Sequence, residues 1–196
     1  MKMNCRTSRV TIPHDLNMVS EINSDALFIL LIDQSSNAYI LERELARFAE
    51  RFPRIIVFIN QVHGQPANTT GLFLMEMKMK FPNMPMLALV NASPEGVKML
   101  LSLEGLDVKW LGIRTDDFAK YKIPTNVDTP LTEVDIKLAR HLLEEERVQK
   151  NPVLRDDLNH MVATESTVES DAVLALGAPF LYQVYLPLKL QYMDWQ

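Results

Sequence analysis

Polar side chains that could bind a phosphoryl group or a metal ion stand at the ends of four apolar runs in the sequence. They are Asp33, Gln34, Asn60, Asn91 and Arg114. A carboxylate at such a place can hold Mg²⁺, and an aspartate can accept a phosphoryl group. Only Asp33 carries a carboxylate, and an amide cannot form an acyl phosphate. We therefore expect neither phosphoryl transfer nor a bound metal, with Asp33 as the single weak metal candidate.

The four apolar runs predict the strands of a parallel sheet. They cover residues 26–33 (ALFILLID), 55–59 (IIVFI), 86–90 (MLALV) and 108–113 (VKWLGI). Unbroken apolar runs of this length are typical of strands buried on both faces. Helices are predicted between them, at residues 38–52, 71–81 and 93–103. Strands that alternate with helices indicate an α/β fold, in which ligands bind where the strands end.

The stretch from residue 71 to residue 118 has the order of the last three βα units of a response-regulator receiver domain, which it resembles. Relative to that pattern, Asp33 keeps one of the two metal-binding acids. The other four positions are changed: the second acid is Gln34, the phosphate acceptor is Asn60, the phosphate-sensing residue is Asn91 and the pairing lysine is Arg114. The resemblance implies a receiver-like open parallel sheet with flanking helices and a degenerate phosphoacceptor pocket.

The C-terminal third resembles a helix-turn-helix module of the LuxR/NarL family, over residues 130–145, 158–171 and 174–190. The segment 163–170 (ATESTVES) would form the turn and the start of the recognition helix. The resemblance implies DNA contacts by Thr164, Ser166, Thr167, Ser170 and Arg155. A degenerate receiver joined to such a small helical module is similar to the atypical regulators of the CsgD and VpsT kind. The expected parts are an N-terminal extension (1–25), the receiver-like domain (26–124) and the helical module (125–196).

Charge argues against strong DNA binding by that module. The chain has a net charge of −5, and residues 126–196 hold six Lys and Arg against twelve Asp and Glu. Glu165, Glu169 and Asp171 fall on the expected recognition helix, where they would repel phosphates. We therefore expect binding to promoter DNA to be weak.

Other classes of function lack their signatures in the sequence. Since no Gly-rich phosphate loop, nucleophile elbow or pair of catalytic carboxylates occurs, we expect no enzyme and no cofactor. A lone cysteine, Cys5, and the absence of an apolar run long enough to span a bilayer predict a cytoplasmic protein that does not contact a membrane. Residues 183–195 read either as a strand or as a last helix kinked by Pro187, and in both cases as a docking or dimer element.

Three functions remain open from the sequence. The first is a phosphorylation-independent transcriptional regulator with a pseudo-receiver domain, acting as a homodimer or with a related regulator. The second is a regulatory protein that binds no DNA and acts through protein association. The third is a metal-dependent binding domain that resembles a von Willebrand A domain, and its motif residues would be Asp33, Ser35, Asn37 and Thr70.

Overall fold

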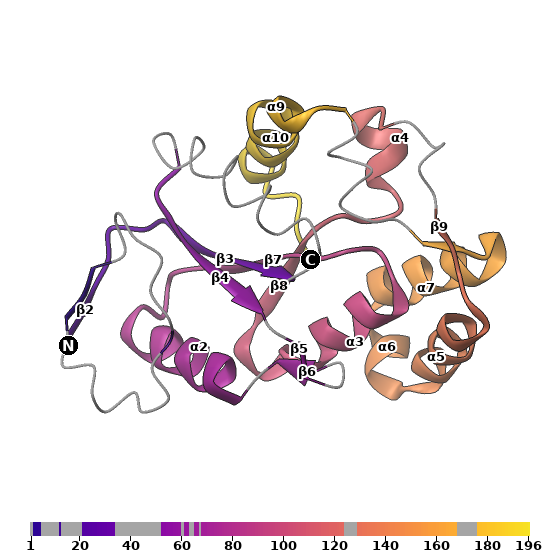
Figure 1. Cartoon of the computed structure of the whole chain (residues 1–196), viewed down its shortest axis with the longest axis horizontal. Coiled ribbons are helices and arrows are strands. Elements are labelled where there is room, and N and C mark those ends of the chain that lie inside the picture. The colour runs from indigo at the N-terminus through magenta and orange to yellow at the C-terminus, as the bar shows by residue number, and fades with distance from the viewer. Residues whose placement is uncertain are drawn as a thin grey trace.

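The fold is built on a four-stranded parallel sheet. The computed structural model describes residues 2–4, 12, 21–33, 52–59, 61–62, 65–66, 68–123, 129–167 and 176–196. Four strands pair in the order β4-β3-β7-β8 (Figure 1), and they are β3 (Phe28–Asp33), β4 (Arg54–Ile59), β7 (Met86–Leu89) and β8 (Val108–Gly112). All three pairings are parallel, which confirms the predicted α/β fold with a parallel sheet.

The two middle strands explain why the apolar runs do not alternate with polar residues. Leu30 and Leu31 of β3, like Leu87 and Ala88 of β7, are completely buried. Such strands need apolar side chains at successive positions because helices cover both of their faces. The edge strand β4 instead alternates between buried and half-buried residues.

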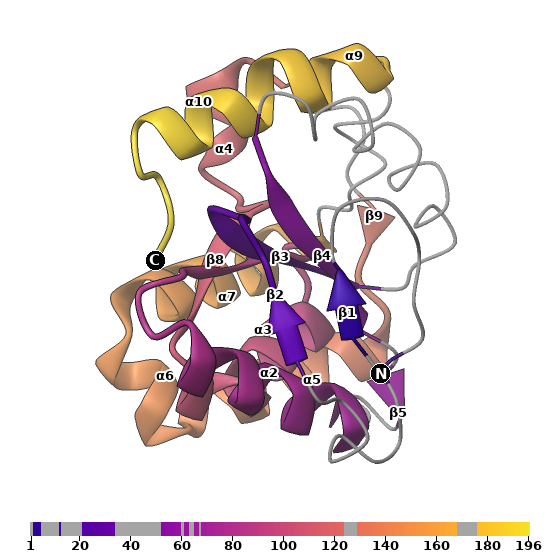
Figure 2. The same cartoon turned by 90° about the vertical axis from the view of Figure 1, so that its left-hand side faces the viewer.

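Helices lie on both sides of the sheet. One side carries α2 (Asn68–Lys80) and α3 (Pro94–Ser102), and the other carries α4 (Asp117–Tyr121), α9 (Ala178–Phe180) and α10 (Leu186–Gln191) (Figures 1 and 2). The helix predicted at 71–81, where three methionines alternate with charged residues as in a strand, is confirmed as α2. It buries Phe73, Leu74 and Met77. Most of the helix predicted at 38–52 lies outside the described residues.

A helical part follows the sheet and packs against α3. It consists of β9 (Thr129–Pro130), α5 (Glu133–Glu144), α6 (Glu146–Lys150), α7 (Pro152–Thr164) and β10 (Ser166–Thr167). The N-terminus of α5 has a capping box, in which Thr132 and Asp135 bond to each other's backbone N–H. Helix α7 begins at Pro152, behind the capping side chain of Asn151.

The expected recognition helix is not found at the described part of residues 163–170. Helix α7 ends at Thr164, and Glu165 takes the left-handed conformation that stops it. Ser166 and Thr167 then pair antiparallel with β9. The interpretation of residues 163–170 as part of a helix-turn-helix motif was therefore wrong about the local structure, because a strand pairing decides it.

The C-terminal segment is helical and ends against the sheet. A π-helical turn, Leu181–Tyr185, leads directly into α10, in which Pro187 is the second residue. The helix alternative for this segment is thus the correct one. After α10, Gln196 exchanges two backbone hydrogen bonds with Trp110 of β8, of 2.6 and 3.2 Å.

The remaining described elements are short. They are β1 (Lys2–Asn4) and β2 (Glu21–Asn23), which pair in parallel, the hairpin strands β5 (Gln61–Val62) and β6 (Gln65–Pro66), and a 3₁₀ turn, Glu104–Leu106. In the described part of the chain, no helix is long and apolar enough to cross a bilayer.

Candidate functional site

The strand order identifies one edge of the sheet as the place for a functional site. From β3 the chain moves outward to β4, and it then returns to place β7 on the other side of β3. The strand order therefore reverses between β3 and β7, and open α/β sheets bind ligands beyond the carboxyl ends of the strands at such a switch point. Ile32 pairs with Leu89, so Asp33 and Asn91 leave the sheet at the same edge.

The turn that follows β7 is tight and internally bonded. The N–H of Ser93 donates to the carbonyl of Asn91 at 2.9 Å, and the hydroxyl of Ser93 accepts from the N–H of Gly96 at 3.1 Å. A Cβ atom on Gly96 would stand 2.2 Å from the Asn91 carbonyl oxygen. Only glycine therefore allows α3 to begin this close to the end of the strand.

The strand β10 covers this turn and uses residues that the sequence assigned to DNA binding. Thr167 is buried, and its hydroxyl donates to the carbonyl of Ala92 at 2.6 Å. Thr164 donates to the carbonyl of His160, and the hydroxyl of Ser166 donates to that of Thr164. These bonds tie Thr167 to the sheet edge, whereas Thr164 and Ser166 only bond locally.

The other two residues of that group are not brought to the same place. Arg155 lies on α7 and pairs with Asp156 at 3.0 Å, and Ser170 lies outside the described residues. A role of the five residues in DNA binding stays a prediction. The structure offers no recognition helix that would carry it in the described part of this segment.

Beyond β8 the expected pocket residue Arg114 is engaged in ion pairs. Its side chain is only 4% exposed, and its guanidinium lies 2.8 Å from Asp194 and 3.3 Å from Asp116. Its backbone N–H donates to the Asp117 carboxylate at 2.9 Å. Arg114 therefore connects the end of β8 to the C-terminal segment.

A second cation completes this group, which we call the C-terminal ion cluster: Arg114, Asp117, Tyr121, Tyr185, Lys189 and Asp194. Lys189 and Asp117 are both fully buried, with Nζ and Oδ1 2.5 Å apart. The hydroxyl of Tyr185 donates to the other carboxylate oxygen of Asp117 at 2.5 Å. Asp194 accepts from Lys120 and from the hydroxyl of Tyr121, each at 2.7 Å.

Burial and charge shift the titration of the cluster. Burial lowers the pKa of Lys189, although the carboxylate of Asp117 opposes this shift. Burial raises the pKa of the Tyr185 hydroxyl well above its usual value, and the Asp117 charge adds to the rise. Burial also acts to raise the pKa of Asp194, but the hydrogen bonds from Lys120 and Tyr121 and the charges of Lys189 and Arg114 together lower it. The cluster thus joins β8, α4 and α10 through paired charges, which is a structural role.

Little in the sequence indicates this cluster. Asp117 and Lys189 are 72 positions apart, and no spacing rule connects them. The one available signal was a lysine within the apolar run LPLKL, because a lysine in such a run is buried only when it is paired.

A metal site does not emerge from the described residues. No group of three or more His, Cys, Asp or Glu among them could hold a metal ion. Gln34 and Asn60 of the expected pocket lie outside the described residues, and only the strand position of Asp33 is described. The structure therefore brings Asp33 and Asn91 to one edge and leaves the pocket as a prediction.

Comparison with known proteins identifies the family. The sequence profile of the Toprim domain shared by Spo11 and the A subunit of topoisomerase 6 matches residues 28–190. The A subunit of DNA topoisomerase 6 from Arabidopsis thaliana is 43% identical over 94% of the chain, and the A3 subunit from Oryza sativa subsp. indica is 39% identical over 94%. The meiotic recombination protein SPO11 of Mus musculus is 23% identical over 97%. The chain spans 45%, 43% and 50% of the length of these relatives.

These matches overturn the interpretation as a response regulator. The profile covers both the sheet and the helical part, so neither a LuxR/NarL-type regulator nor a von Willebrand A-like domain describes the chain. The prediction of a role in transcriptional regulation is also wrong. The expectation that the chain is no enzyme is overturned because it is a homologue of a DNA topoisomerase component. The chain belongs to the Toprim-domain family of Spo11 and the topoisomerase 6 A subunit.

Proposed function

We propose that this chain acts on DNA as the Toprim portion of a protein related to the topoisomerase 6 A subunit, in control of DNA topology. The observation that carries the proposal is the continuous family match from β3 into α10, together with 43% identity to the A subunit of a topoisomerase 6. DNA cleavage is not part of the proposal for this chain alone, since the chain spans 45% of the length of that relative.

Meiotic recombination is the second candidate. The Arabidopsis thaliana relative named "Meiotic recombination protein SPO11-2" is 30% identical over 90% of the chain. This identity is lower than the 43% to the topoisomerase component of the same plant, and we therefore favour the topoisomerase role.

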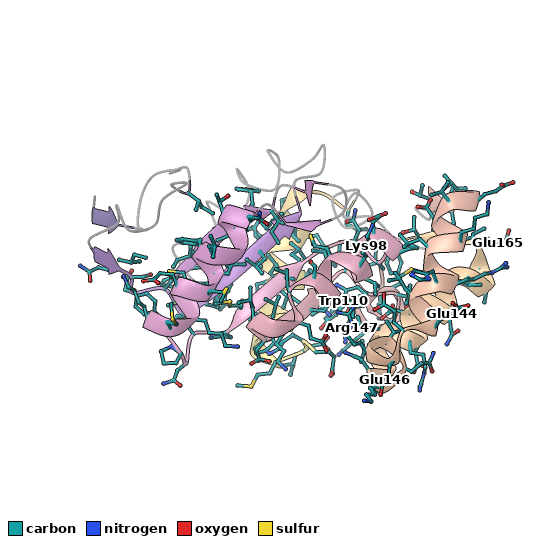
Figure 3. The ribbon with its side chains drawn as sticks, turned by 90° about the horizontal axis from the view of Figure 1, so that it is seen from below. Lys98, Trp110, Glu144, Glu146, Arg147 and Glu165 are labelled. Carbon is teal, nitrogen blue, oxygen red and sulfur yellow. The ribbon has the colours of Figure 1, made fainter. Side chains whose placement is uncertain are left out.

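The helical part is not the surface that we expect to hold the DNA backbone. Glu144, Glu146 and Glu165 are exposed on it (Figure 3), and acidic side chains repel phosphates. Arg147, a basic residue of the same helical part, is itself paired with Glu145 and Glu104. We expect the DNA to contact the sheet-bearing part of the chain.

Competition binding tests the proposal. The purified chain is titrated with a fluorescent duplex at several salt concentrations, and binding is then competed with the same plasmid in supercoiled and linear form. We expect binding that weakens steeply with salt and a supercoiled plasmid that competes better than the linear one. No binding at low salt would contradict a role on DNA, and equal competition would contradict a role in DNA topology.

Two further expectations from the sequence remain proposals. One is association with a second copy of the chain, which sedimentation over a hundredfold range of concentration would test. The other is a cytoplasmic location, which imaging of the tagged chain in its own cells would test.

A further inference from the structure

Among the described residues, the switch-point edge offers little that a DNA-cleaving site could use to hold a metal. Enzymes that break phosphodiester bonds commonly place divalent cations on carboxylates, because the cations neutralise the reacting phosphate. Here β3 ends in Asp33, but the turn after β7 offers Asn91 and Ser93. An amide and a hydroxyl bring no negative charge to a cation.

The described polar groups near this edge are also occupied. The hydroxyl of Ser93 caps α3, and the carbonyl of Ala92 accepts from Thr167. Asp117 is held by Lys189. Asp157 accepts from both the N–H and the hydroxyl of Thr115.

A fixed positive charge follows the neighbouring strand. Val90 donates to Gly112 and accepts from Ile113, each at 2.7 Å, which keeps β7 and β8 together to their ends. The next residue along the chain, Arg114, is buried and charged. Arg114 is paired with Asp116, Asp117 and Asp194, so the carboxylates after β8 are already engaged by a cation of the protein.

We infer that this chain has no tight divalent-metal site of its own at the switch point, because the residues at positions 91 and 93 are neutral. The residues present do not fit the metal that DNA cleavage would call for. The inference uses the proposed function only to say where a metal would be expected. It concerns the binding of a metal ion and not the cleavage of DNA.

Carboxylates can be introduced there by two substitutions. Asn91→Asp is nearly isosteric, and in Ser93→Asp the new side chain is as good an N-cap for α3 as the serine. Asn151→Asp is the matched control, because Asn151 also stands at a helix N-terminus, that of α7, away from the switch point.

The test is a calorimetric titration of the purified chain with Mn²⁺, with circular dichroism to show that each variant is folded. We expect no binding tighter than about 1 mM for the wild type and for Asn151→Asp, and at least tenfold tighter binding for Asn91→Asp/Ser93→Asp. Wild-type binding below about 0.1 mM that Asp33→Asn weakens tenfold would overturn the inference. A folded double variant that gains no Mn²⁺ binding would overturn the assignment to positions 91 and 93.

The titration separates this inference from the proposed function. Mn²⁺ binding is measured in the absence of DNA, so a chain that binds neither DNA nor Mn²⁺ would contradict only the proposed function. A chain that binds both DNA and Mn²⁺ would contradict only the inference.

Discussion

Replacing Lys189 by methionine tests whether the C-terminal ion cluster stabilises the fold. Methionine has nearly the length of lysine, so the substitution removes the charge with little change in volume. Asp117 would then keep a buried carboxylate without its partner at 2.5 Å. Removing one partner of a buried ion pair costs about 3–5 kcal/mol, because the remaining charge cannot reach water.

We place the expected loss near the lower limit of that range. Asp117 would still accept hydrogen bonds from the Tyr185 hydroxyl and from the N–H of Arg114, whose guanidinium lies 3.9 Å away. The free energy of unfolding should fall by about 3 kcal/mol. For a chain of this length, such a loss lowers the melting temperature by about 6–12 °C.

Urea unfolding followed by circular dichroism measures the loss, with Lys150→Met as the matched control. Lys150 pairs with Glu146 at 2.6 Å, but the two side chains are 73% and 81% exposed, so we expect a change below about 0.5 kcal/mol. The double variant Lys189→Met/Asp117→Asn should lose less than the sum of its single variants. Equal stability of the Lys189 and Lys150 variants would refute the reasoning.

Three further contacts can be tested by substitution. Because the folded pKa of Asp194 lies below that of an unfolded aspartate, its charge stabilises the fold at neutral pH, and the advantage is lost on acidification. Wild type should therefore be more stable than Asp194→Asn in urea at pH 7, with a difference that shrinks below about pH 4. Gly112→Ala would put a methyl group 2.0 Å from the Tyr185 hydroxyl and should lower the free energy of unfolding in urea by about 2 kcal/mol. Gly71→Ala is the control, because Gly71 has open space around it and alanine there should not destabilise the chain. Thr167→Val should cost about 1 kcal/mol in the same assay, because it removes the hydrogen bond to the Ala92 carbonyl, and should leave the anisotropy of bound duplex unchanged. Weaker DNA binding by a folded variant would instead support Thr167 as a DNA contact.

The four strands of the main sheet and the helices α2 and α3 could be predicted from the sequence because local patterns determine them. The apolar runs that became β3 and β7 are long enough, and apolar enough, to fit only a strand covered on both faces. The helix α2 could be recognised from composition, although Met75 and Met79 alternate with charged residues as in a strand.

The C-terminal third could not be predicted in the same way, since long-range contacts determine it. Ser166 and Thr167 are polar and follow a helix, and only their pairing with Thr129 and Pro130 makes them a strand. A three-helix pattern in sequence is also shared by unrelated domains, and it was this pattern that favoured a DNA-binding module. The sequence predicted correctly where the strands of the sheet end. It did not identify the family, because many parallel sheets bind ligands at the carboxyl ends of their strands, and a receiver domain is only one of them.

The two hydrogen bonds between Gln196 and Trp110 also concern the behaviour of the protein in concentrated solution. An open strand edge is a template on which another chain can add a strand, and this is a common start of aggregation. Gln196 occupies part of the β8 edge, and Asp194, two residues earlier, is anchored by Arg114, Lys120 and Tyr121. Breaking the C-terminal ion cluster would therefore release the segment that shields this edge. Variants of the cluster should precipitate at protein concentrations at which equally destabilised variants of the α5–α7 helices stay dissolved.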